Sequence, residues 1–471
     1  MDGAARISDD GAMAETGMKA AAPAAPALAR RLGLFDAVML VMGGIIGAGI
    51  FINPYVVAQR VHTPALILGA WAAGGVVALL GAFAYAELAQ HLPTVGGQYA
   101  YLREAFHPAV AFVYGWALLL VIQTGGMAAV AVTFGHYVRV LAGGGPSAGE
   151  LAALALAGLT AINCLGVRGG SNVQSALMLL KLAAIAGLVA AGAWLLPAAG
   201  TTAAAQAYAA AGPGASWLDF GAAMTAVLFA YGGWQTATFL AGEMREPRRD
   251  LPRGLVLGVL GVVAVYLAVN AVTLRALGPA GLAHAPAPAA AVMRRALGRT
   301  GEVWIAAGIA LSALGFLSQS MLTAPRVYFA MASDGLFFRA LAGVNRRTRA
   351  PMAAILLQGA WAIVIAASGH YAQILNYVVA TDFVFFGLTA ASIFILRRRL
   401  RREGKRLNEI ISARMPGHPW TTLAFIAACW SVVLATLVRY PRNSALGWAI
   451  DLAGIPIYLL WKRKARLSRK R

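Results

Sequence analysis

Long apolar segments with very few charges recur along the whole chain and limit what it can fold into. A helix needs about 20 apolar residues to cross the roughly 30 Å hydrocarbon core of a bilayer. In that core every backbone polar group must be paired within the protein, which favours helices for such segments. We therefore predict an all-α integral membrane protein with twelve transmembrane helices. The predicted spans cover residues 34–58, 63–91, 108–141, 149–166, 172–196, 219–244, 252–275, 301–331, 352–369, 371–397, 419–438 and 443–461.

Composition and basic residues support a membrane protein with a defined orientation. Charged residues make up 12% of the chain, whereas soluble domains carry about 25%. With a cytoplasmic N-terminus, 30 of the 39 Lys and Arg fall on the cytoplasmic side and eight on the opposite side. The positive-inside rule then predicts that both termini face the cytoplasm. We expect a multi-pass protein of the plasma (inner) membrane.

The ends of the chain and one loop are polar. Residues 1–33 are Ala-rich and lack the apolar core of a cleavable signal peptide, so we expect a disordered cytoplasmic tail. We expect residues 398–418 to form a basic cytoplasmic loop and residues 462–471 a basic cytoplasmic tail. Because these segments flank spans, their charge favours contact with anionic membrane lipids rather than with nucleic acid.

Glycines interrupt the first predicted span within the stretch GGIIGAGIF, residues 43–51. A dinucleotide-binding loop would need a strand before these glycines, which a chain of apolar spans does not offer. Close helix packing is a second explanation, because small residues let helices approach. Unwound backbone is a third, since glycine is costly within a helix and irregular backbone at membrane depth lines cavities.

A second interruption, FAYGGWQ at residues 229–235, lies within the sixth predicted span and decides between these explanations. Broken helices at corresponding positions of two inverted repeats indicate the binding site of a secondary transporter. We therefore expect a transporter core at 34–397, with repeats at 34–196 and 219–397. Residues 419–461 would then form helices 11 and 12.

The ends of broken helices can hold a zwitterion. A half-helix N-terminus presents free N–H groups and partial positive charge, and a C-terminus presents carbonyls and partial negative charge. The N–H groups suited to a carboxylate are those of Gly47, Ala48 and Gly49. The carbonyls suited to an ammonium are those around Ile45, Phe229 and Ala230. The arrangement fits an α-amino acid, with Phe229 as a thin gate and Tyr231 and Trp234 shaping the walls.

Four stretches together resemble the amino acid–polyamine–organocation superfamily, and within it the L-type amino acid transporter family and its bacterial permeases. They are IIGAGIF at 45–51, AYAELAQHLPTVGGQYAYL at 84–102, FAYGGWQTATFLAGEMREPRRDLPRG at 229–254 and LTAPRVYFAMASDGLFF at 322–338. The resemblance implies a LeuT-like fold with a 5+5 inverted repeat and two additional helices. It also implies substrate-backbone binding at Ile45, Gly47, Ala48, Gly49, Ile50, Phe229, Ala230, Tyr231, Gly232, Gly233 and Trp234.

The chain departs from the pattern of this family at three places. Ala48 stands where a small hydroxyl is common, which leaves backbone N–H groups to hold the carboxylate. The acidic pair often found after the helix-6 motif is reduced to Gly242–Glu243. The loop between the third and fourth spans has no cysteine, so we expect no disulfide-linked heavy chain.

Lys181 is a charge deep within the fifth predicted span. A Lys at this depth costs at least about 2.5–3.5 kcal/mol on insertion scales and usually marks function. Snorkelling to the interface is the alternative. Similar permeases carry a lysine here, where sodium-coupled relatives hold a cation. We hypothesise that the ammonium replaces sodium and ties helix 5 to the unwound part of helix 1.

Other charged side chains are candidates for coupling or gating. Asp382 lies at apparent membrane depth and is either a proton site or a packing residue near a helix boundary. Glu87, Glu243 and Arg326 lie near cytoplasmic helix ends, where an ion pair could close an inner gate. The seven histidines show no ligand spacing, so we expect no metal site and no cofactor.

The predicted function is transport of amino acids by alternating access, as sodium-independent exchange. Side-chain specificity would come from Gln123, Thr124, Gln235 and Ser318. None of these is acidic, which favours neutral L-amino acids, because a buried unpaired cation is costly. A carrier of cationic amino acids or polyamines and a transport-inactive sensor remain alternatives, as do uniport and proton symport. An enzyme is not expected, because no paired polar catalytic set lies at one membrane depth.

Overall fold

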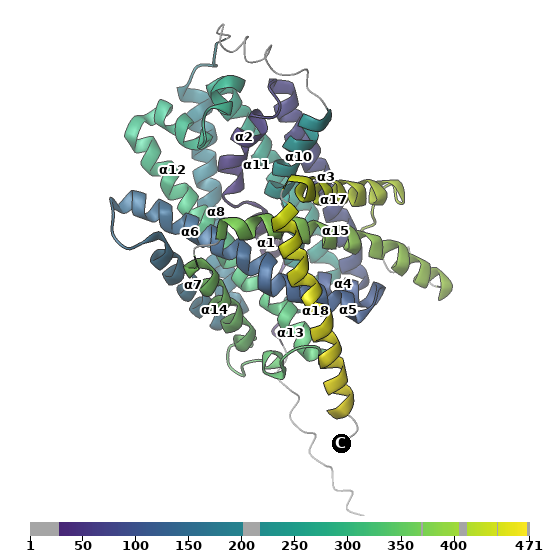
Figure 1. Cartoon of the computed structure of the whole chain (residues 1–471). Helices are drawn as coiled ribbons and strands as arrows, with labels where there is room; N and C mark the ends of the chain where they lie inside the picture. Colours follow the sequence, from purple (N-terminus) through teal and green to yellow (C-terminus); the bar gives the residue numbers. More distant parts are fainter. Residues whose placement is uncertain (1–27, 201–216, 369–370, 405–411, 440, 469–471) are drawn as a thin grey trace, which may run out of the picture.

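The computed structural model describes residues 28–200, 217–368, 371–404, 412–439 and 441–468 (Figure 1). Regular structure within these residues is helical, with one isolated parallel bridge between Leu32 and Met244. Most of the predicted N-terminal tail lies outside the described residues, as do parts of the basic loop and of the C-terminal tail. The prediction of an all-helical chain is confirmed for the described part.

Seven described helices are long and apolar enough to cross a membrane, or eight if the bent pair α1 (Leu34–Ile45) and α2 (Gly49–Ala58) is one span. The seven are Pro64–His91 (α3), Pro108–Ala142 (α5, Pro108–Ala117; η1, Leu118–Ile122; and α6, Gln123–Ala142), Val167–Leu195 (α8, Val167–Ala190; and η2, Ala191–Leu195), Pro247–Ala283 (α11), Pro288–Ser333 (α12, Pro288–Thr323; and α13, Pro325–Ser333), Trp420–Arg439 (α17) and Pro441–Arg463, within α18 (Pro441–Ser468). The other helices of the bundle are α7 (Ala148–Cys164), α10 (Trp217–Tyr231), η3 (Trp234–Glu243), α14 (Met352–Ala367) and α15 (Tyr371–Arg402). The short helices α4 (Gln98–Ala105) and η4 (Arg339–Ala342) follow α3 and α13.

Local sequence marks where several of these helices begin. Pro64, Pro108 and Pro288 stand in the first turn, where a missing N–H costs nothing. Ser147 and Glu150 form a reciprocal capping box at the start of α7. Both α11 and α12 contain a glycine with non-helical backbone angles, Gly278 and Gly298 respectively. The seventh predicted span therefore ends before Gly278, and the eighth begins after Gly298.

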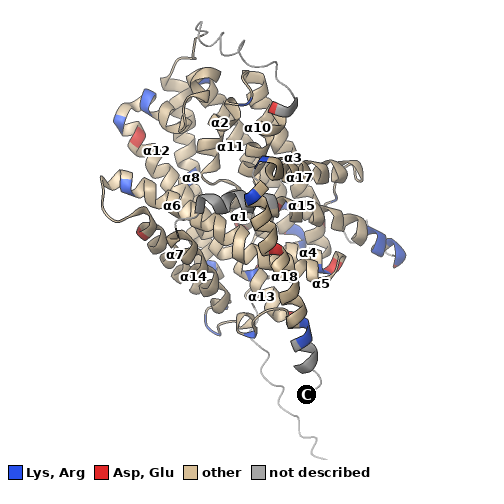
Figure 2. Cartoon of the chain, viewed as in Figure 1, with Lys and Arg blue, Asp and Glu red and all other residues tan. Residues whose placement is uncertain are grey.

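The broken helices α1 and α2 lie within the bundle, packed against α8, α11 and α12 (Figure 1). Glycines permit this closeness, since a Cβ on Gly254 of α11 would be 2.4 Å from the Cβ of Ala37 on α1. Helix α17 packs against α15 and α3, and α18 packs against α15 and α5. Lys and Arg gather at the free ends of α15 and α18 in Figure 2, as expected for helix ends that leave a membrane.

Candidate functional site

The first span breaks between α1 and α2, which are inclined to each other by 45°. Three successive carbonyls at this break accept hydrogen bonds from side chains of three different helices. The Tyr266 hydroxyl on α11 lies 3.1 Å from the Ile45 oxygen, and Ser312 Oγ on α12 lies 3.1 Å from the Gly47 oxygen. Lys181 Nζ on α8 donates to the Ile46 oxygen, and its side chain is fully buried. These side chains thus satisfy backbone carbonyls that the interrupted helix leaves without a partner.

The N–H groups of Gly47, Ala48 and Gly49, at the same break, have no hydrogen-bond partner among the described residues. They belong to the start of α2, where unpaired N–H groups and the helix dipole attract anions.

The second interruption lies within the sixth predicted span, between α10 and η3, at Gly232 and Gly233. Gly233 has φ +109°, which favours glycine, and a Cβ there would lie 2.1 Å from the Gly44 carbonyl oxygen. Thr236 Oγ1 donates to the Gly233 carbonyl at 2.7 Å and accepts from Gln319 Nε2 at 2.5 Å. The two breaks are therefore in direct contact.

A cavity of about 270 Å³ lies between the two breaks and is bordered by α6, α12 and α15. This volume is slightly below the usual range for drug-sized ligands and suits a small molecule. The sequence-predicted residues that line it are Ile45, Gly47, Ala48, Gly49, Gln123, Phe229, Ala230, Gly232, Gly233, Gln235 and Asp382. The Oδ1 atom of Asp382 has no hydrogen-bond partner among the described residues.

Five other candidates lie outside this lining: Ile50, Thr124, Tyr231, Trp234 and Ser318. The Trp234 ring packs 5.0 Å from the Phe386 ring, and the Tyr231 ring 4.9 Å from the Tyr266 ring. Thr124 Oγ1 donates to the Leu119 carbonyl of η1, the segment just before its own helix, at 2.5 Å. Their positions follow from helix rotation, which turns these side chains toward neighbouring helices rather than toward the cavity.

Several residues of the site were not predicted. Thr236, Phe316 and Gln319 line the cavity, and Tyr266 and Ser312 bind its backbone. Tyr266, Ser312 and Gln319 are polar side chains within apolar spans, and that signal was available in the sequence. The partners of these side chains could not be predicted from the sequence, because each contact joins residues far apart in the chain.

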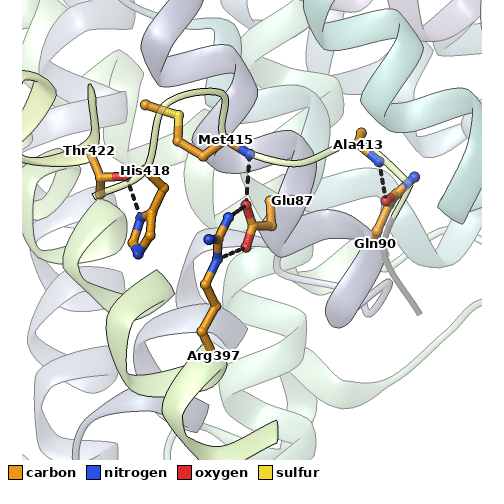
Figure 3. A network of polar contacts seen from close by, with 7 residues as sticks. All are labelled: Glu87, Gln90, Arg397, Ala413, Met415, His418 and Thr422. Carbon is orange, nitrogen blue, oxygen red and sulfur yellow. Dashed lines mark hydrogen bonds and ion pairs between the residues drawn. The ribbon is translucent and has the colours of Figure 1, made fainter. Parts of the chain in front are cut away.

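Two bidentate ion pairs lie on the side predicted to face the cytoplasm. Arg326 Nε lies 2.6 Å from Glu243 Oε1, and both side chains are fully buried. Arg397 donates to both oxygens of Glu87, at 2.6 and 2.7 Å, and the Met415 N–H donates to Oε2 at 2.8 Å (Figure 3). Glu87 thus pairs with Arg397 rather than with Arg326.

The second ion pair belongs to a network that fixes the segment before α17. Gln90 Oε1 accepts from the Ala413 N–H at 2.9 Å (Figure 3). It also accepts from the Ser412 N–H at 2.9 Å. Burial and the neighbouring Arg397 guanidinium lower the pKa of His418 below its ordinary value. Among the described residues no group of three His, Cys, Asp or Glu could hold a metal ion.

The sequence matches the family model for amino acid permeases over residues 32–460. The chain belongs to the amino acid permease family. It is 31% identical to the serine/threonine exchanger SteT of Bacillus subtilis, over 93% of this chain and 98% of that protein. It is 29% identical to the rat large neutral amino acids transporter small subunit 2, over 93% of this chain and 83% of the relative. The human b(0,+)-type amino acid transporter 1 is 30% identical, over 81% and 79%.

Membership confirms the resemblance inferred from the four motifs and the prediction of a membrane transporter rather than an enzyme. The match includes both helix breaks and the cavity between them.

Proposed function

We propose that this permease exchanges amino acids, mainly neutral L-amino acids, by sodium-independent alternating access. The contact between the two glycine breaks around one cavity carries the proposal, because paired broken helices mark the binding sites of secondary transporters. The names of the relatives support it, since one is a serine/threonine exchanger and another transports large neutral amino acids.

The substrate backbone would bind to main-chain groups of both breaks. Its carboxylate would accept from the N–H groups of Gly47, Ala48 and Gly49. Its ammonium would donate to the carbonyls of Ile45 and Ala230, which both lie near the Tyr266 hydroxyl, at 3.1 and 3.0 Å. A hydroxyl has one proton to share between them, so these carbonyls keep capacity for a second donor. Gln123, Gln235 and Phe229 would contact the substrate side chain.

The architecture proposed for this cycle has twelve spans in a LeuT-like arrangement. Residues 34–196 and 219–397 would be inverted repeats, and 419–461 would add two helices. Both termini would face the cytoplasm across the plasma (inner) membrane, in line with the excess of Lys and Arg on that side. We expect no disulfide-linked heavy chain, because the loop between the third and fourth spans has no cysteine.

Lys181 would act in place of a sodium ion. Its ammonium donates to the Ile46 carbonyl at the break of the first span, a position where a fixed positive charge can stabilise unwound backbone without a bound cation. The buried Arg326–Glu243 pair would close the inner side, because the Glu243 carbonyl also accepts from the N–H groups of Arg31 and Leu32 ahead of α1.

One observation favours a second substrate class. Asp382 lines the cavity, and its Oδ1 lacks a partner among the described residues, so it could pair with a cationic side chain. Competition by lysine, arginine or putrescine that disappears in Asp382→Asn would establish cationic substrates. The absence of such competition would support neutral amino acids as the substrates.

Uptake into vesicles tests the proposal directly. The purified protein is placed in liposomes at equal pH without sodium, either empty or loaded with unlabelled serine or leucine. We expect labelled amino acid to enter loaded vesicles several-fold faster than empty ones. Equal uptake into both would indicate uniport or, if a pH gradient raises accumulation, proton symport. No uptake by folded protein would contradict the proposed substrates.

A further inference from the structure

A second cavity, of about 430 Å³, lies where the segment before α1 meets the start of α8. It shares no lining residue with the cavity between the helix breaks. Three arginines line it, namely Arg31, Arg168 and Arg245. Together with the carboxylate of Asp36, they give the lining a net charge of +2.

Backbone hydrogen bonds bring two of these arginines together from the segment before α1 and the segment after η3. The Arg245 N–H donates to the Leu32 carbonyl at 2.9 Å, and the Arg31 N–H donates to the Glu243 carbonyl at 2.9 Å. Within the part of the chain that the structure describes, neither guanidinium forms an ion pair. Both charges are therefore available to an anion.

The third arginine is already engaged in part. Arg168 Nη1 lies 3.4 Å from Asp36 Oδ2, which also accepts from the Gly33 N–H at 2.9 Å. Asp36 Oδ1 accepts from Ser171 Oγ at 2.6 Å. The Asp36 carboxylate thus accepts hydrogen bonds from several neighbouring donors. The Arg168 side chain is 48% exposed, so its guanidinium can also contact an anion.

The cavity changes from charged to apolar along one face of α8. Arg168, Asn172, Ser175 and Leu179 follow one another at helical spacings of four, three and four residues, so they form a single stripe. Leu179 is 53% exposed, and Phe35 on α1 is 57% exposed. In a membrane protein such apolar side chains face lipid, so the cavity has a basic end and a lipid-facing end.

We propose that this cavity binds one anionic phospholipid of the cytoplasmic leaflet. Guanidinium groups bind phosphate through paired, charge-assisted hydrogen bonds, and basic pockets between helices on this side of a membrane suit anionic headgroups. The phosphate lies among Arg31, Arg168 and Arg245, and an acyl chain follows Phe35 and Leu179. The lipid links the segment before α1, the start of α8 and Arg245, two residues after the end of η3. This site is independent of the proposed substrate.

Native mass spectrometry of the purified full chain tests the site. The protein in neutral detergent is titrated with phosphatidylglycerol or phosphatidylcholine of the same acyl chains. We expect one phosphatidylglycerol to bind more tightly than phosphatidylcholine, and Arg31→Gln/Arg245→Gln to weaken that binding at least about tenfold, as lost charged hydrogen bonds would. The matched control is Arg139→Gln/Arg299→Gln, which removes two exposed arginines, one from α6 and one from α12, on the side predicted to face away from the cytoplasm, and should leave binding unchanged.

Three results would overturn the site. They are equal affinity for the two lipids, unchanged binding by the Arg31/Arg245 double variant, and complete displacement of the lipid by glycerol phosphate at equal concentration, which would indicate a site for soluble anions. Should the double variant fail to fold, the wild-type protein still decides. A lipid that binds the native state raises the unfolding temperature, so phosphatidylglycerol must raise it more than phosphatidylcholine does.

Discussion

Gly44 and Gly233 face each other across the two helix breaks, each occupying the space that a side chain on the other would need. A Cβ on Gly233 would lie 2.1 Å from the Gly44 oxygen, and a Cβ on Gly44 would lie 2.6 Å from the Gly233 oxygen. Residues 189 positions apart in the sequence thus allow two interrupted helices to touch at one point. The cavity lies beside that contact, so its shape depends on both glycines.

Gly233→Ala is expected to reduce exchange at least about tenfold. The new methyl group would meet backbone, which cannot move aside as a flexible side chain can, and φ +109° is strained for any residue with a Cβ. Uptake into loaded vesicles measures the effect. Gly69→Ala is the control, because a methyl group there would meet no neighbouring side chain or helix within 4 Å. Equal activity of the two variants would show that the breaks need no close contact.

Tyr266→Phe removes a hydroxyl that joins the two breaks, through the oxygens of Ile45 and Ala230. Buried carbonyls that lose a donor cost about 1–3 kcal/mol each, so we expect lower thermal stability and exchange reduced about tenfold. Tyr328→Phe is the matched control, since the buried Tyr328 hydroxyl has no partner among the described residues. Similar unfolding temperatures and uptake rates for the two variants would contradict a bridging role for Tyr266.

Lys181→Met keeps the approximate volume of the side chain and removes its charge. We expect exchange to fall at least about tenfold, because the Ile46 carbonyl loses its charged donor. Wild-type uptake should not respond to sodium. Leu180→Ala, at a half-exposed neighbouring position on α8, should retain activity. Sodium-stimulated uptake by the wild type, or full activity in Lys181→Met, would refute the proposed substitution for sodium.

Breaking the Arg326–Glu243 pair should destabilise the protein strongly. Removing one partner of a buried ion pair costs about 3–5 kcal/mol, so Arg326→Gln should lower the unfolding temperature clearly. Arg249→Gln breaks an ion pair whose side chains are 60% and 61% exposed, for which about 0–1 kcal/mol is expected. Thermal unfolding in detergent compares the two variants. Equal decreases in unfolding temperature would show that the buried pair contributes no more to stability than the exposed one.

The helices and the two breaks could be predicted from the sequence, because both depend on local residue patterns. Apolar length marks a span, and glycines within a span mark an interruption, so the touching stretches at 43–51 and 229–235 were found without a structure. The direction in which each individual side chain points could not be predicted from such local patterns. Tyr231 and Trp234 flank the cavity residues in sequence but pack against Tyr266 and Phe386 instead.

Partners of buried polar groups were the least predictable part. Glu87 was a candidate for an ion pair with Arg326, yet its partner is Arg397, 310 residues further along the chain. The bridge between Leu32 and Met244 joins two segments that no local pattern connects. Such contacts depend on how the helices pack, and one sequence contains no direct record of packing.

A structure of the protein with a bound neutral amino acid tests the central claim most directly. We predict that the substrate carboxylate lies within hydrogen-bonding distance of the N–H groups of Gly47, Ala48 and Gly49, and its ammonium within that distance of the Ile45 or Ala230 carbonyl. A substrate that binds in this cavity without either contact, or that binds elsewhere in the chain, would contradict the account.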